Sequence, residues 1–220
     1  LRGTHLKIGF DIFEHGIIKR RVEDGYTEED DDWVEGHPIM FPNILLVGDE
    51  VRSTFQFRVP VDDEHTYHVS YYAWRPAPGT KAPTQEVVPY RYVPLKDETG
   101  RYINDILFNQ DYLAWVTQGP IAKRHLEKLG ESDKGIILFR KLLKEQAQLV
   151  SDGADPMNTF REPGTNLNLY VPNEQKEGDD NWKGQKERSY QGGLSTGNSG
   201  KYSPIGRAQA ETAGRPVPED

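Results

Sequence analysis

The chain has 220 residues, of which 35% are hydrophobic and 28% are charged, a composition that suits one globular domain with its own core. Its 27 Lys and Arg against 35 Asp and Glu give a net charge of -8, which argues against general binding to nucleic-acid phosphates. The lack of cysteine excludes disulfides and cysteine-ligated clusters within the chain and fits a cytoplasmic protein, and no run approaches the ~18 apolar residues of a membrane span.

The first part of the chain predicts β-strands. Apolar and other residues alternate over 6–13, and a second short run covers 16–22 after a turn at His15-Gly16. The acidic stretch 22–33 contains many turn-forming residues and predicts a solvated loop. The apolar stretch 37–48 is interrupted by two prolines, so we expect an edge or bulged strand there.

Residues 51–74 predict a β-hairpin. Apolar residues alternate up to an acidic turn at Asp62-Asp63-Glu64, and aromatic and β-branched residues fill the returning segment. The three acids could also form a paired-carboxylate or cation site, but a hairpin turn explains acids at this position better. Residues 77–89 are proline-rich and predict a connection.

The later part of the chain has the spacing of helices. Residues 109–118 and 121–129 predict two short helices, and Ser132 is a candidate cap for a longer one. From Ile136 to Val150 apolar residues recur at helical spacing, and an Asp-Gly pair predicts the helix end. Strands followed by a long amphipathic helix predict an α+β fold, in which an antiparallel sheet carries the helix on one face.

The last quarter of the chain differs from the rest. Residues 173–220 are polar, glycine-rich and nearly free of aliphatic side chains. Such a segment buries too little apolar surface to offset its ordering entropy, so it predicts a flexible tail after a folded domain at 1–172. The chain starts without an initiator Met and without a signal peptide, and we expect it to be a piece of a longer protein.

Asp111 is the acid that these patterns explain least. It stands just ahead of the apolar group 113–116. A helix start favours negative charge, so capping or a surface position is one explanation, and metal binding is the other. The residues alone favour capping or a surface position. Among the histidines no pair has the spacing of a helical metal site, and His65 and His68 would point to opposite faces of a strand.

Four segments, which follow one another over about residues 5–172, carry a family resemblance. They are GHPIMFPNIL (36–45), FRVPVDDEHTYH (57–68), NQDYLAWVTQGPIAKRHLEKLGESDKGIILFRKLL (109–143) and VSDGADPMNTFREP (150–163). Together they resemble the catalytic domain of Rieske non-haem iron oxygenases, in particular the α-subunits similar to phthalate 4,5-dioxygenase. The third segment is the most distinctive of the four.

The resemblance implies a helix-grip, START-like domain, which agrees with the order of strands and helix. It also implies a mononuclear Fe(II) held by two histidines and one carboxylate, and Asp111 stands at the carboxylate position. Asn109 and Gln110 are then candidates for orienting Asp111. The motifs for the two histidine ligands and for the Rieske [2Fe–2S] cluster are not in this chain. We therefore expect the C-terminal part of an oxygenase subunit, inactive by itself.

For the intact protein the resemblance implies a homotrimer that hydroxylates or O-demethylates a small aromatic substrate with O2. Electrons would come from NAD(P)H through a reductase or ferredoxin. Candidate pocket residues are Phe57, Arg58, His68 and Phe108, and strand alternation makes Phe57 and Arg58 face opposite ways. Arg58 could pair with a substrate carboxylate or with a nearby acid of the chain.

Two other functions stay open. One is a metal-free helix-grip module that binds a hydrophobic ligand, and the other is a structural subunit whose last residues wrap a neighbour. Iron in the intact protein would distinguish the first of these from an oxygenase. One mononuclear iron and one [2Fe–2S] cluster per subunit support the oxygenase, and no iron supports the binding module.

Overall fold

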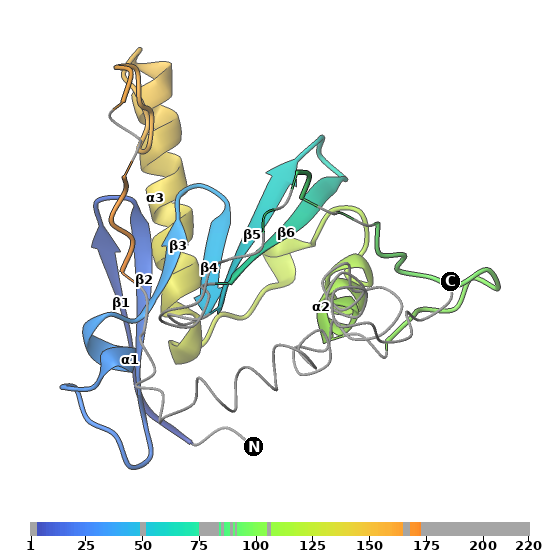
Figure 1. Ribbon diagram of the computed structural model, residues 1–220, viewed down its shortest axis with the longest axis horizontal. Helices are drawn as coiled ribbons and strands as arrows, with labels where there is room; N and C mark the ends of the chain where they lie inside the picture. The colour runs from blue at the N-terminus through green and yellow to red at the C-terminus, as the bar shows by residue number, and fades with distance from the viewer. Residues whose placement is uncertain are drawn as a thin grey trace. The chain divides into compact units, whose positions relative to one another are not determined.

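The computed structural model describes residues 4–48, 52–74, 84, 86–88, 90, 92–104, 107–164 and 168–172 (Figure 1). They belong to two compact units, which we call the sheet unit (Leu1–Pro76 with His125–Glu177) and the second unit (Ala77–Arg124 with Gly178–Asp220). Each is described by itself. The predicted tail 173–220 and most of the predicted connection 77–89 lie outside the described residues.

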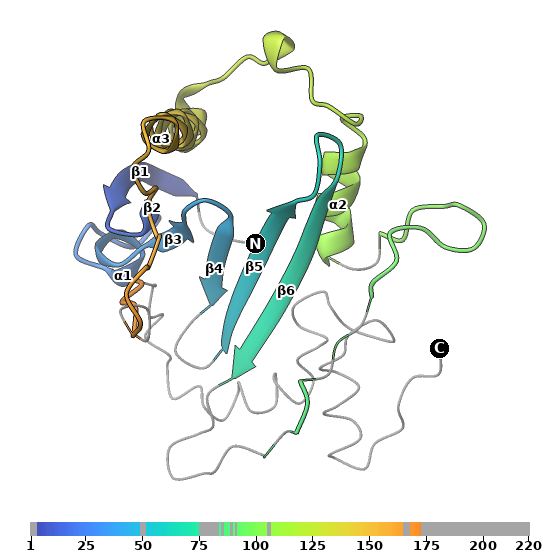
Figure 2. The same ribbon diagram turned by 90° about the horizontal axis from the view of Figure 1, so that it is seen from above.

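Six antiparallel strands form one sheet in the sheet unit, and each strand pairs with the next one in the chain (Figures 1 and 2). The strands are β1 (His5–Phe13), β2 (Gly16–Glu23), β3 (His37–Met40), β4 (Ile44–Gly48), β5 (Arg52–Pro60) and β6 (Thr66–Trp74). The strand patterns in the sequence therefore predicted β1, β2 and the β5–β6 hairpin correctly.

The stretch 37–48 forms two strands inside the sheet, so the prediction of one edge strand is wrong. A turn at 41–43 reverses the chain between β3 and β4. Proline suggests an edge because it cannot donate a hydrogen bond to a neighbouring strand. Here β3 pairs with β4 only at Ile39 and Met40, and Pro38 is paired only with Ile18 of β2. This short pairing explains how β3 accommodates Pro38 within the sheet.

The long helix α3 (Lys134–Ser151) packs on one face of the sheet beside β1 and β2 (Figure 2). Its end agrees with the predicted Asp-Gly stop. Ser132 does not cap α3, because it lies in the 3-10 turn Glu131–Asp133 and Asp133 occupies the cap position. The core between helix and sheet consists of Ile17, Phe41 and Leu142, with Phe10, Leu138, Phe139 and Met157 packed against it. The α+β prediction is confirmed.

Fewer apolar side chains of α3 are buried against the sheet than their helical spacing in the sequence suggested. Ile136, Leu143 and Val150 are 45%, 45% and 54% exposed, whereas Leu142 is 3% exposed. The backbone of α3 comes close to the sheet at Gly135, which explains why only part of this apolar surface is buried. A Cβ atom built on Gly135 would lie 2.3 Å from Cε1 of Phe10, so the backbone of α3 itself contacts the β1 side chain.

Gly135→Val is expected to lower the free energy of unfolding by about 2–3 kcal/mol, because the new side chain overlaps the Phe10 ring in the core. Urea unfolding of the 220-residue chain measures the change. Gly130→Val is the control, since the nearest atom to its Cβ is a flexible carboxylate oxygen of Asp133 at 3.9 Å. Equal losses for the two variants would contradict this packing.

The acidic stretch 22–33 is not a plain solvated loop throughout. Its last residues enter the short helix α1 (Asp31–Val34). Nε of Arg21, whose side chain is 2% exposed, donates to Oδ2 of Asp32 at 2.8 Å and lies 3.3 Å from Oε1 of Glu23. A buried guanidinium requires acidic partners, so part of the acidic run is structural.

The second unit contains the helix α2 (Leu107–Val116) and a closed turn over residues 95–103, where the Ile103 amide donates to the Leu95 carbonyl at 3.0 Å. The predicted helix 109–118 is therefore confirmed with an earlier start. The predicted helix 121–129 is wrong, because only the 3-10 turn Arg124–Leu126 forms there. Among the described residues no helix is long and apolar enough to cross a membrane.

Candidate functional site

Asp111 lies in the interior of α2 and not at its start. The helix begins at Leu107, more than one turn before Asp111. At Asp111 the backbone amide already has a partner within the helix and needs no cap. Capping is therefore the wrong explanation for this residue, whereas the surface position agrees with the structure. The Asp111 side chain is exposed and accepts no hydrogen bond from any residue that the structure describes.

The exposed side of α2 around Asp111 is aromatic and apolar. Trp115, one turn further along, is 43% exposed, and Phe108 precedes Asp111 by one turn. Residues at these spacings share one side of a helix. The Tyr112 ring lies 5.4 Å from the Trp115 ring and 6.3 Å from the Phe108 ring, measured between centroids. The Asp111 carboxylate thus lies beside a row of aromatic rings that contact one another.

Asn109 and Gln110, the candidate supports of Asp111, make hydrogen bonds elsewhere. Asn109 is 0% exposed, and its Nδ2 donates to the Pro94 carbonyl at 3.0 Å. Gln110 is exposed, and its Nε2 donates to the Asn104 carbonyl at 2.8 Å. Both amides therefore tie α2 to residues 92–104 and do not donate to the Asp111 carboxylate.

The sheet face that carries α3 changes from apolar to polar across the sheet. A row of directly paired residues crosses all the strands on this face: Ile12, Ile17, Ile39, Leu45, Gln56 and Ser70. Gln56 and Thr54 are buried, and the Ser70 Oγ is buried without a hydrogen-bond partner among the described residues. We call Thr54, Gln56, Arg58, His68 and Ser70 the polar sheet face.

Arg58 and His68 face each other within the polar sheet face. They are direct partners in the β5–β6 pairing, and Nη2 of Arg58 donates to Oε1 of Gln56 at 2.9 Å. Burial, and then the charge of Arg58, hold the pKa of His68 below its ordinary value. His68 is therefore neutral near pH 7. Phe57 lies on the opposite sheet face, as alternation predicted, and Phe108 belongs to the second unit.

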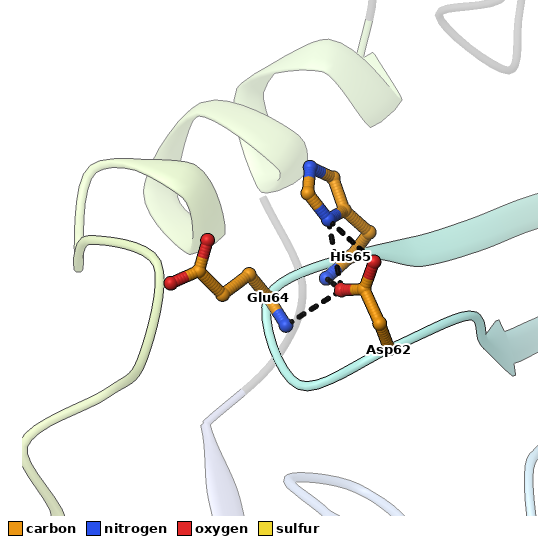
Figure 3. A network of polar contacts seen from close by, with 3 residues as sticks. All are labelled: Asp62, Glu64 and His65. Carbon is orange, nitrogen blue, oxygen red and sulfur yellow. Dashed lines mark hydrogen bonds and ion pairs between the residues drawn. The ribbon is translucent and has the colours of Figure 1, made fainter.

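The acids between β5 and β6 form a hairpin turn, as predicted (Figure 3). Oδ1 of Asp62 accepts hydrogen bonds from the amides of Glu64 and His65 at 2.9 and 2.8 Å, and from Nδ1 of His65 at 2.8 Å. The Glu64 amide and then the His65 side chain lower the pKa of Asp62. Turn formation thus accounts for Asp62 and His65.

Comparison with known proteins gives matches across most of the chain. Residues 95–191, which contain α2 and α3, match the family described as LigXa C-terminal domain like. The chain is 34% identical over 168 residues to the 5,5'-dehydrodivanillate O-demethylase oxygenase subunit of Sphingobium sp. strain SYK-6, covering 76% of the chain and 39% of that relative. The chain belongs to the family of oxygenase subunits similar to phthalate 4,5-dioxygenase.

Two further relatives in this family of oxygenase subunits are more distant. The phthalate 4,5-dioxygenase oxygenase subunit of Pseudomonas putida is 25% identical over 175 residues, which cover 67% of the chain and 38% of the relative. Phenoxybenzoate dioxygenase subunit alpha of Ectopseudomonas oleovorans is 29% identical over 158 residues, which cover 68% and 36%. The chain spans about two fifths of the length of the relatives it matches.

The predicted iron of this oxygenase family can be tested against the side chains present. Within the described ranges no three His, Cys, Asp or Glu side chains gather, so these residues do not complete a metal site. Asp111 suits one ligand position. Its carboxylate is exposed and makes no hydrogen bond to the described part of the chain, and carboxylate oxygen is a ligand that non-haem Fe(II) uses.

Sequence reasoning missed the buried members of the polar sheet face, Thr54, Gln56 and Ser70. The alternating apolar residues of β5 predicted the strand, and Thr54 and Gln56 between them had no predicted role. Thr54, Gln56 and Arg58 share the other side of β5, and Gln56 is 5% exposed. Their common spacing was the available signal, but polar residues at alternate positions of a strand usually indicate a solvated face.

Proposed function

We propose that this chain is the catalytic part of a Rieske-type aromatic-ring oxygenase subunit, with residues 1–172 as the catalytic domain and 173–220 as a flexible tail. Asp111 is the carboxylate ligand of a mononuclear Fe(II). The exposed Asp111 carboxylate, in the interior of α2 and within the segment that matches the family, carries this proposal. When bound, the iron supplies the redox chemistry that activates O2.

The proposed substrate is an aromatic carboxylate that is hydroxylated or O-demethylated. The three relatives are named for dehydrodivanillate, phthalate and phenoxybenzoate, all of which are aromatic acids. On the polar sheet face Arg58 is the cation, and Gln56 orients its guanidinium. A guanidinium binds a carboxylate through parallel hydrogen bonds, so Arg58 can hold the acid group, with neutral His68 beside it.

Other parts of the intact subunit complete the proposed enzyme. They supply the two histidine ligands and the Rieske [2Fe–2S] cluster, and the subunits form a homotrimer in the cytoplasm. Electrons pass from NAD(P)H through a reductase or ferredoxin. Support comes from the relatives, which are named as subunits of oxygenases and are longer than this chain. The 220-residue chain alone is then inactive.

Metal analysis and one single-turnover experiment test the proposal. We expect the purified intact subunit to hold one mononuclear iron and one [2Fe–2S] cluster. After chemical reduction and exposure to ¹⁸O2 with phthalate, 3-phenoxybenzoate or 5,5'-dehydrodivanillate, mass spectrometry should find ¹⁸O in a hydroxylated product, or formaldehyde released by O-demethylation. The 220-residue chain treated in the same way serves as the blank.

The two parts of this experiment can fail separately. An intact subunit without mononuclear iron would contradict the oxygenase and favour a metal-free binding module. A subunit that holds the iron but yields no product from any of the three acids would contradict the proposed substrate class.

A further inference from the structure

Asn109 is a fully buried polar side chain of the second unit. It is 0% exposed, and its Nδ2 donates to the Pro94 carbonyl at 3.0 Å. Its Oδ1 is also buried and has no hydrogen-bond partner among the described residues. The amide cannot be turned around to exchange these atoms, because the carbonyl of Pro94 only accepts hydrogen bonds. A buried polar atom without a hydrogen-bond partner is rare and costs stability. We therefore looked for a role of Asn109 in the hydrogen bond that its Nδ2 does make.

The acceptor for Asn109 belongs to a segment that is closed on itself. Lys96 and Tyr102 form an antiparallel bridge, and the Ile103 amide donates to the Leu95 carbonyl at 3.0 Å. Within this turn Oδ1 of Asp97 accepts the amides of Thr99 and Arg101 at 2.8 and 3.0 Å. Asn109 therefore attaches α2 to a braced turn.

Helix geometry connects this attachment to Asp111. Residues two apart in an α-helix point about 160° apart around its axis, so the buried Asn109 and the exposed Asp111 lie on opposite sides of α2. A rotation of α2 by about 20° would displace a side-chain atom at the ~5 Å outer radius of the helix by about 2 Å. Ligand sites tolerate displacements of only about 0.5 Å.

We propose that Asn109 is a positioning residue, whose buried hydrogen bond to Pro94 fixes the rotation of α2 and so the direction of the Asp111 carboxylate toward the metal. This inference rests on the proposed function, because it needs Asp111 to be a ligand. In this role Asn109 does not hydrogen-bond to the Asp111 carboxylate, because it lies on the opposite side of the helix.

The test compares two variants of the intact subunit. Asn109→Leu keeps the size of the side chain and removes the bond to Pro94. Gln110→Ala is the matched control, because it removes the neighbouring and exposed tie of α2 to the Asn104 carbonyl. The readouts are hydrogen exchange of residues 107–116, iron affinity from competition with a chelator, and the ligand-field spectrum of the ferrous site.

For Asn109→Leu we expect exchange in α2 to be at least about tenfold faster and iron affinity to fall by about 10–100-fold, the range found when groups supporting metal ligands are removed. The ferrous spectrum should shift while the cluster content is unchanged. Gln110→Ala should change each quantity less than about threefold. A role in stability alone would lower the thermal midpoint without shifting the spectrum of the iron that remains.

Unchanged exchange in α2 of Asn109→Leu would overturn the attachment. Faster exchange with unchanged iron affinity and spectrum would overturn the positioning role. Failure of the proposed function is seen separately, because the wild-type subunit would then lack the mononuclear iron before any variant is compared.

Discussion

Replacing Asn158 with alanine is expected to lower the free energy of unfolding of the 220-residue chain by about 4 kcal/mol. The Asn158 side chain joins three segments of the sheet unit. Its Nδ2 donates to the carbonyls of His15 and Phe41 at 3.0 and 2.6 Å, and its Oδ1 accepts from Nδ1 of His15 at 2.9 Å. One side chain thus connects the segment after α3 to the β1–β2 turn and to the β3–β4 turn.

The size of the effect follows from these bonds and from the backbone. His15 and Phe41 are each 6% exposed, so water cannot fully replace the lost amide. The loss of three hydrogen bonds costs about 3 kcal/mol in total. Asn158 also has a φ of 66°, a left-handed conformation that costs alanine about 1 kcal/mol more.

Urea unfolding measures the loss, and two variants separate its causes. Asn158→Gly removes the same hydrogen bonds but accepts the left-handed backbone, so it should lose about 1 kcal/mol less than alanine does. Thr159→Ala changes an exposed neighbour and should stay within about 0.5 kcal/mol of wild type. A loss below about 1 kcal/mol for Asn158→Ala would show that the amide does not hold the three segments together.

Asp111→Ala has the largest expected effect on activity. In the intact subunit it removes one of the three protein ligands proposed for Fe(II). Loss of a group that only supports a ligand costs about 10–100-fold in metal affinity, so loss of the ligand itself should cost more than about 100-fold. Oxygen insertion should fall with the bound iron, while the [2Fe–2S] cluster, held by other residues, is retained.

Iron content and ¹⁸O in the product measure this effect side by side. The control is Glu98→Ala, which removes an exposed carboxylate from the same unit. It should keep the iron and the product yield of wild type. Asp111→Glu keeps the charge but moves the carboxylate outward by one methylene, so we expect it to recover part of the iron binding. Wild-type iron content in Asp111→Ala would remove Asp111 from the ligand set.

Local patterns in the sequence were sufficient for the elements whose period is regular. The alternation over 6–13, the short run 16–22 and the hairpin pattern of 51–74 identified four of the strands. The helical period after Ile136 identified α3 in the same way. The stripe of α3 that packs inward was not predictable from hydrophobicity, because Gly135, which has no side chain, lies against the Phe10 ring of β1.

Long-range contacts account for most of what the sequence did not reveal. The bond between Asn158 and His15 joins residues 143 positions apart, and no local pattern signals it. Asp32 looks like one more acid in a solvated run until the buried Arg21 is placed beside it. For Asp111, the position within α2 excludes capping and the exposed side chain agrees with a surface position. The proposed role as a ligand comes from the family resemblance and not from the helix.

A crystal structure of the intact subunit, with anomalous scattering recorded at the iron absorption edge, tests the central claim most directly. We predict a mononuclear iron at direct bonding distance from the carboxylate of Asp111, with two histidines from outside this chain as the other protein ligands. An iron bound elsewhere, or an Asp111 carboxylate that faces only solvent, would contradict the account.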